Sequence, residues 1–181
     1  EKGRARIIEV DLATGKKRDY AVGLRNPVGI AWEPNSDALW TVVNERDMLG
    51  SDLVPDYMTH VEVGTHFGWP WNYWGGYEDF RVEPRRQDLR EYTRRPDYAL
   101  GSHVAPLGLT FASKAALGGG FANGAFVALH GSWNRKPASG YKAQRQTAPA
   151  TRGSSTSCTS RPPPVDPRID VGYACVMFSG C

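Results

Sequence analysis

The amino-acid sequence predicts an all-β chain built from blades of a β-propeller. Glycine (20 residues) and proline (13 residues) are plentiful among the 181 residues. No stretch carries a sustained apolar period of 3.6 residues, so short strands joined by turns are expected. A pattern of proline, apolar, glycine, apolar, small and aromatic residues occurs twice, at residues 27–32 and 106–111. Such a repeat is typical of propeller blades, and we expect two to three of them here.

The first predicted element is a hairpin. Residues 6–12 alternate polar and apolar side chains, and residues 13–16 have the composition of a turn. Residues 17–22 form the second run of strand-type residues. Two such runs joined by a short turn predict a pair of antiparallel strands.

Each copy of the repeat predicts two neighbouring strands. In the first copy, we expect the strand that holds Val28, Ile30 and Trp32 to lie innermost and to pack against neighbouring blades on both faces. The second strand of each copy ends in polar residues, at 44–47 and at 130–135. Loops at one end of propeller strands meet around the channel mouth, so these residues are well placed to form a site.

An insertion rich in glycine and aromatic residues, 66–77, separates the two copies. Its rings are consistent with two structures. They form either a stacking platform for a flat cofactor or a sugar, or a satellite core beneath a long loop.

The chain changes in character after residue 142. Residues 144–170 hold few large apolar side chains and many Thr, Ser, Arg and Pro residues. This composition cannot bury enough apolar area to offset the entropy of ordering. We therefore expect a partial propeller over residues 1–142 and a disordered or out-of-frame tail over 143–181. The three cysteines all lie in that tail, and their odd number and spacing support neither a zinc site nor a disulfide framework.

Charge and hydropathy exclude several partners. The 22 basic and 19 acidic residues give a net charge of +3, which offers no case for nucleic acid or an anionic membrane as partner. No apolar run is long enough to span a bilayer, so the sequence predicts a soluble chain with no transmembrane segment.

Six motifs occur in a fixed order over about residues 4–142. They are Gly-Leu-Arg-Asn-Pro at 23–27, Asn-Glu-Arg-Asp at 44–47, the run at 53–59, Gly-Trp-Pro at 68–70, the run at 101–108 and His-Gly-Ser-Trp-Asn-Arg at 130–135. Together they resemble the bacterial glucose/sorbosone dehydrogenases. This resemblance implies a six-bladed propeller that oxidises a sugar with pyrroloquinoline quinone (PQQ) and calcium, transfers electrons to an external acceptor, and works in the periplasm or elsewhere outside the cytoplasm.

The same resemblance implies the site residues. Arg25 is the expected catalytic residue, because an arginine there can stabilise the charge of the reduced quinone. Oxygen ligands suit calcium, so Glu45, Asp47 and Asp52 are the expected metal ligands; the alternative is an ion-paired loop in which Arg46 neutralises its neighbours. The expected cofactor-binding residues are Arg25, Asn26, His103, His130, Trp133, Asn134 and Arg135.

Three interpretations of function remain at this stage. The first is a PQQ-dependent sugar dehydrogenase, of which this chain is a piece that is inactive alone, because the family's base histidine would precede Glu1. The second is a non-enzymatic propeller that binds a carbohydrate or a protein, since fold does not settle function. The third is a nonfunctional gene fragment, which the tail favours.

Overall fold

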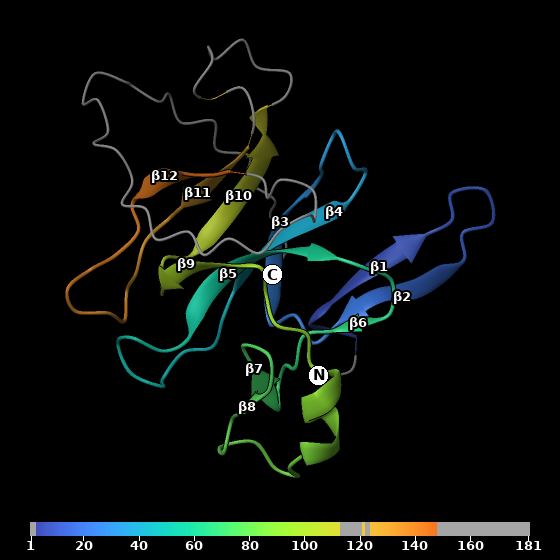
Figure 1. The fold of residues 1–181 in the computed structure, drawn as a ribbon. Helices are drawn as coiled ribbons and strands as arrows, with labels where there is room; N and C mark the ends of the chain where they lie inside the picture. The colour runs from blue at the N-terminus through green and yellow to red at the C-terminus, as the bar shows by residue number, and fades with distance from the viewer. Residues whose placement is uncertain (1–2, 113–120, 122–123, 148–181) are drawn as a thin grey trace, which may run out of the picture. The chain divides into compact units, whose positions relative to one another are not determined.

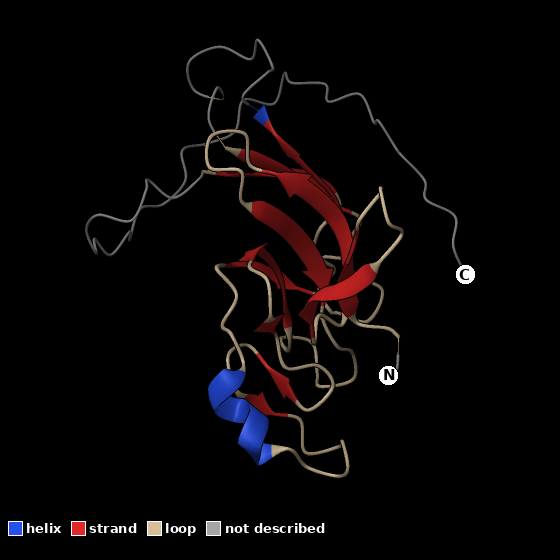
Figure 2. Cartoon of the chain, turned by 90° about the vertical axis from the view of Figure 1, so that its right-hand side faces the viewer, coloured by secondary structure: helices blue, strands red, loops and turns tan. Residues whose placement is uncertain are grey.

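The computed structural model describes residues 3–112, 121 and 124–147, which lie within one compact unit, residues 1–148. The strands form three larger sheets and one small two-stranded sheet (Figure 1). A short 3₁₀ helix, η1, is the one helix in this part of the chain, and it is not long and apolar enough to cross a membrane. It lies at one end of the described part of the chain, away from the larger sheets (Figure 2). The elements are β1 (Arg6–Val10), β2 (Lys17–Val22), β3 (Asn26–Trp32), β4 (Leu39–Asn44), β5 (Pro55–Val61), β6 (Thr65–His66), β7 (Asn72–Tyr73), β8 (Tyr77–Glu78), η1 (Gln87–Tyr92), β9 (Tyr98–Ser102), β10 (Pro106–Phe111), β11 (Ala125–Leu129) and β12 (Lys142–Gln146).

The first sheet has the strand order β1-β2-β6. Strands β1 and β2 pair antiparallel, with Val10 opposite Lys17. The carboxylate of Asp11 closes the turn by accepting the N–H groups of Ala13 (2.8 Å) and Thr14 (3.0 Å). Aspartate favours turns because its side chain can satisfy nearby backbone donors in this way. The hairpin predicted from the sequence is therefore confirmed.

In the central sheet, β3-β4-β5-β9, the two middle strands β4 and β5 are buried on both faces. Successive side chains of a strand point to opposite faces, and β4 accordingly supplies two separate cores. Trp40 and Val42 pack with Met58 toward the third sheet. Val43 packs with Tyr57 toward the first sheet. Each fully buried apolar side chain of this kind stabilises the fold by roughly 1.5–3 kcal/mol.

The third sheet, β10-β11-β12, repeats the inner part of the central one. Strand β10 packs beside β3, and Gly29 in β3 is buried at their closest approach. A Cβ atom on Gly29 would lie 2.8 Å from the backbone nitrogen of Leu109 and 3.0 Å from the carbonyl carbon of Gly108. Glycine thus allows the two inner strands to approach one another. The predicted all-β, partial-propeller fold is confirmed.

Strand β12 crosses the expected boundary at residue 142. Its five residues, Lys142–Gln146, pair antiparallel with β11 along its whole length. The sheet therefore continues four residues into the segment that the sequence analysis assigned to the tail. The rest of the predicted disordered tail lies outside the described residues.

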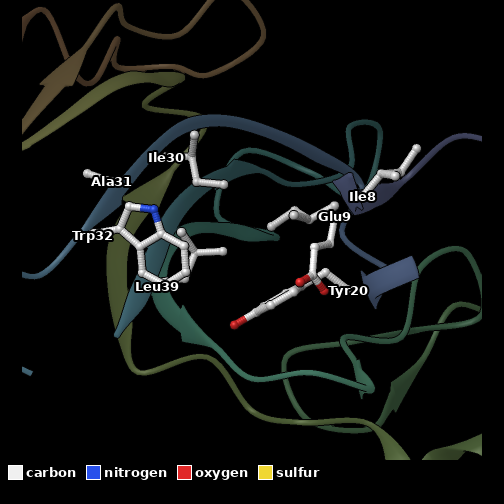
Figure 3. Close-up of a pocket in the computed structure, with 8 residues that line it drawn as sticks. Ile8, Glu9, Tyr20, Ile30, Ala31, Trp32 and Leu39 are labelled. Carbon is white, nitrogen blue, oxygen red and sulfur yellow. The ribbon is translucent and has the colours of Figure 1, made fainter. Parts of the chain in front are cut away.

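One packing prediction is wrong. Val28, Ile30 and Trp32 are 41%, 50% and 60% exposed instead of packed between blades. Ile30 and Trp32 line an apolar groove of about 250 Å³ between the first and central sheets, together with Ile8 and Tyr20 (Figure 3). Strand β1 is the edge strand of the first sheet, and within the described residues no further strand pairs with it. The first sheet is therefore too narrow to cover these side chains of β3. Glycine and alanine between them are suited to close packing, but burial also needs an opposing sheet.

The contact between the inner strands gives a stability prediction. Replacing Gly29 with alanine should lower the free energy of unfolding by about 1–3 kcal/mol, because the new methyl group must displace backbone atoms. Gly108→Ala is the matched control, since its Cβ would lie 3.4 Å from the Ala128 Cβ, close to ordinary contact. Urea unfolding of both variants measures the difference, and equal losses would contradict the close approach.

Candidate functional site

Four separate segments converge on the carboxylate of Asp47. Its Oδ2 accepts a hydrogen bond from Arg25 Nη2 at 3.0 Å, and its Oδ1 accepts one from Asn134 Nδ2 at 3.0 Å. The Nδ1 atom of His103 lies 3.5 Å from the same Oδ1. Antiparallel pairing places the start of β3, the end of β4, the end of β9 and the end of β11 at one edge of the sheets. We call these four residues, Arg25, Asp47, His103 and Asn134, the Asp47 cluster.

A pocket of about 270 Å³ lies beside the Asp47 cluster. It is lined by Met48, Gly50, Ser51 and Asn134. The Oδ1 atom of Asn134 is buried and has no hydrogen-bond partner. A buried acceptor without a partner is costly, so this atom marks a place where a ligand that donates a hydrogen bond would be stabilised.

His103 and Arg135 both contact the loop between β4 and β5, which also carries Asp47. His103 is buried, with a φ of 57°, and its Nε2 lies 2.9 Å from the carbonyl oxygen of Gly50. A carbonyl oxygen only accepts, so the His103 Nε2 carries a hydrogen in this contact. Arg135 pairs with Asp52 at 3.1 Å. A positive φ at a residue that has a side chain is strained, and such strain is concentrated at functional sites.

Three predicted cofactor-binding residues make no hydrogen bond or ion pair with Asp47 in the described part of the chain. Asn26 and His130 are exposed, and the side chain of Trp133 is 78% exposed. Asn26 is paired across the sheet with Asn44, while the backbone N–H of His130 bonds to Ala105. The structure therefore brings together Arg25, His103 and Asn134, with Arg135 nearby, but not these three.

The structure also separates the three carboxylates predicted as metal ligands. Glu45 is buried against Arg46, Asp47 pairs with Arg25, and the exposed Asp52 pairs with Arg135. Each carboxylate has a different guanidinium as its partner, so the loop is ion-paired, but of these three carboxylates Arg46 pairs only with Glu45. No group of three or more His, Cys, Asp or Glu side chains that could hold a metal ion occurs in the part of the chain that the structure describes.

Arg46 is buried beneath the loop and joins it to the aromatic insertion. Its side chain is 1% exposed and pairs with Glu45 and Asp79, each at 3.2 Å. The guanidinium also stacks with the rings of Trp69 (4.9 Å) and Tyr73 (5.0 Å). Stacking on aromatic faces suits arginine because its planar cation is weakly hydrated. These two rings therefore cover a protein cation. Of the other rings of the insertion, Phe67 is buried in a core with Trp74 packed against it, which fits the core alternative for those two.

Asp79 links Arg46 to the backbone of the loop. Arg81 donates to both of its oxygens, at 2.8 and 2.7 Å, and these bonds, with the charge of Arg46, lower the pKa of Asp79 to about 2. The remaining Nη1 of Arg81 donates to the carbonyl oxygens of Asp47 (3.0 Å) and Met48 (3.2 Å). Charge-assisted hydrogen bonds thus run from Arg46 through Asp79 and Arg81 to the backbone of the loop.

Asp56 joins two of the four segments that carry the Asp47 cluster, those of Asp47 and His103. Its oxygens accept the backbone N–H of Glu45 (2.7 Å) and of Ala105 (2.8 Å). Burial raises the pKa of Asp56 to about 6, while those two hydrogen bonds and the nearby His103 oppose the shift. A carboxylate in this position fixes the spacing between neighbouring blades at the site.

Sequence reasoning missed Asp56, Asp79 and Arg81. A signal for Asp56 exists, because it stands in a strand between apolar residues, and an unpaired charge there would be costly. Asp79 and Arg81 follow the aromatic insertion without periodicity, so no pattern marks them.

Comparisons with known proteins show the family of the chain and support its fold. The model of the family described as TrAA12-like matches residues 58–161, which is more than half of the chain. The chain belongs to the TrAA12-like family. It is also 30% identical over 93 residues to the aldose sugar dehydrogenase YliI of Escherichia coli, covering 51% of this chain and 24% of that protein. This is partial homology to PQQ-dependent aldose sugar dehydrogenases.

Solved structures support the fold. The iodide structure of the Trichoderma reesei protein of carbohydrate-active enzyme family AA12 superposes with a TM-score of 0.66 and 18% identity, over 81% of this chain and 44% of that one. The calcium structure of that protein gives 0.60 at 18% identity, over 81% and 42%. The holo PQQ domain of pyranose dehydrogenase from Coprinopsis cinerea gives 0.62 at 23% identity, over 78% and 43%. The chain spans less than two fifths of the length of the curated relatives it matches.

Arg46 gives a prediction for stability. Arg46→Met should lower the free energy of unfolding by about 3–5 kcal/mol, because it leaves the buried carboxylate of Glu45 uncompensated. Arg85→Met is the control: Arg85 is exposed and stacks on Phe80, and its loss should cost no more than about 0.5 kcal/mol. Urea unfolding compares the two, and similar small losses would show that Arg46 is not needed.

Asp56 gives a prediction for pH dependence. Its pKa is about 6 when folded and about 3.9 when unfolded. Its contribution to stability is therefore full below about pH 4 and is lost as the pH rises through about 6. Asp56→Asn removes this titration. The difference in the free energy of unfolding between wild type and variant should therefore decrease by about 2–3 kcal/mol from pH 4 to pH 7.

Urea unfolding at the two pH values measures that gap. The control is Thr41→Val, which changes a buried polar residue that does not titrate, and its gap should stay constant. A constant or widening gap for Asp56→Asn would contradict the raised pKa.

Proposed function

We propose that the Asp47 cluster and its pocket form part of the cofactor site of a PQQ-dependent sugar dehydrogenase. The observation that carries the proposal is the convergence of Arg25, His103 and Asn134 on one carboxylate beside a pocket. These residues come from separate motifs of the family resemblance, and nothing in their spacing along the chain requires them to meet. Partial homology to an aldose sugar dehydrogenase supports the same function.

The residues at this site fit a planar tricarboxylate. Arg25 and Arg135 keep guanidinium hydrogens beyond those used by Asp47 and Asp52, and guanidinium groups bind carboxylates through paired hydrogen bonds. The free Oδ1 of Asn134 suits an N–H or O–H donor on the ligand. When bound, PQQ would supply the two-electron oxidising chemistry, with a sugar hydroxyl carbon as the hydride donor and an external acceptor to take the electrons on.

Arg25 is the residue of this chain proposed to stabilise negative charge that develops on the cofactor. It is 29% exposed at its side chain, and its guanidinium is fixed by Asp47 Oδ2, by the carbonyl of Glu45 at 2.6 Å and by the ring of Trp69 at 5.8 Å. A cation held from three sides needs little reorganisation when negative charge develops next to it. We propose that it stabilises the charge of the reduced quinone, and that the protein works outside the cytoplasm.

Calcium, the other cofactor implied by the resemblance, does not fit Glu45, Asp47 and Asp52 as they stand. Each of these carboxylates is already paired with an arginine. A calcium ion needs six to eight oxygen ligands around one point. The proposed function therefore assigns no step to a metal ion.

The test is a titration of the purified chain with PQQ, followed by the absorbance of the cofactor. We expect saturable binding, and both Arg25→Gln and Arg135→Gln should weaken it by about tenfold or more, since each removes a charge-assisted contact. Arg18→Gln is the matched control, because Arg18 is an exposed arginine of β2 that pairs with Glu9. Circular dichroism checks that each variant keeps its β structure.

Equal affinity in all variants would contradict the site. Saturable binding of a sugar without binding of PQQ would favour the alternative, a propeller that binds carbohydrate without oxidising it.

A further inference from the structure

The loop between β4 and β5 directs its backbone oxygens toward donors of the protein. Five of its carbonyl groups meet a guanidinium, an imidazole or a hydroxyl group at ordinary hydrogen-bond distance. The pairs are Glu45 with Arg25 (2.6 Å), Asp47 with Arg81 (3.0 Å), Met48 with Arg81 (3.2 Å), Gly50 with His103 (2.9 Å) and Asp52 with Ser102 (2.6 Å).

The side-chain oxygens of the loop are used in the same way. Glu45 accepts from Arg46 within the buried layer, and Asp52 accepts from Arg135. Asp47 accepts from Arg25 on one oxygen and from Asn134 on the other. The oxygens that a hard cation would use therefore already accept hydrogen bonds or ion pairs.

These partners are unfavourable neighbours for a divalent cation. A guanidinium carries donors and no acceptor, so it contributes no ligand. Its charge also repels a metal ion placed on the same oxygen, and more strongly in a partly buried site than in water. Arg81 in particular is anchored by two hydrogen bonds to Asp79, so displacing it would also break that pair.

We infer that residues 45–52 form a loop that is held without a metal ion, in which Arg25, Arg81 and His103 take the oxygen atoms that calcium would need. The position of the loop is then set by protein cations, and a carboxylate ligand beside it meets guanidinium groups in place of a divalent ion. That consequence for ligand binding rests on the proposed function, whereas the metal independence of the loop does not.

The first measurement is thermal unfolding of the full chain, followed by circular dichroism in EDTA and in millimolar calcium. We expect the same midpoint in both solutions, because a ligand that binds only the folded state would raise it. A saturable rise of the midpoint with calcium, absent with the same concentration of magnesium, would overturn the inference.

The second measurement is amide hydrogen exchange of the loop. Arg81→Gln should speed exchange within residues 45–52, and calcium should not restore protection. Arg85→Gln is the control, because Arg85 pairs with Glu83 at 3.1 Å and stacks on Phe80 without touching the loop. Unchanged exchange in Arg81→Gln, or protection of the wild-type loop by calcium, would overturn the inference.

Neither measurement uses PQQ. A loop that responds to calcium would leave the proposed cofactor site standing, and a chain that fails to bind PQQ would leave the metal-free loop standing.

Discussion

A buried carboxylate between two guanidinium groups is the interaction on which the site depends. Asp79 is 3% exposed and bonds to both Arg46 and Arg81. Removing charged groups from water is costly, and the cost is offset only where each partner is hydrogen-bonded. Here all of them are, because Arg46 also donates to the carbonyls of Pro70 (3.2 Å) and Asn72 (2.8 Å). The loop that carries Asp47 thus rests on the aromatic insertion, residues 66–77, and on Asp79 and Arg81, which follow it.

This arrangement explains why the Asp47 cluster can be rigid although its members lie in loops. At the start of the loop, Arg46 pairs with the carboxylate of Glu45, and Asp56 accepts the backbone N–H of Glu45. The backbone at His103 and Ala105 has positive φ values of 57° and 50°, which is unfavourable for residues with a side chain. The hydrogen bond from Ala105 to Asp56 and the contact of His103 with Gly50 offset that strain.

The parts of the structure that follow a local pattern could be predicted from the sequence. The hairpin of β1 and β2 has its alternation and its turn aspartate, and the two inner strands repeat one pattern around Gly29 and Gly108. Arg25, His103 and Asn134 were named through the family resemblance, and the structure brings them together around Asp47. The pairing of Arg46 with Asp79 was not, because it joins residues 33 positions apart whose spacing has no periodicity. The exposure of Val28 and Ile30 was also missed, since apolar composition indicates only that a residue can be buried.

Two tryptophans in contact with water have a practical consequence for studies of this protein. Trp32 is 60% exposed along the groove and Trp133 is 78% exposed, whereas Trp40 is 6% exposed in the core. Indole emission shifts to longer wavelength in polar surroundings. The native emission spectrum should therefore contain a large red component, like that of an unfolded chain. The shift on unfolding should come mainly from the buried Trp40 and from the half-buried Trp69, Trp71 and Trp74.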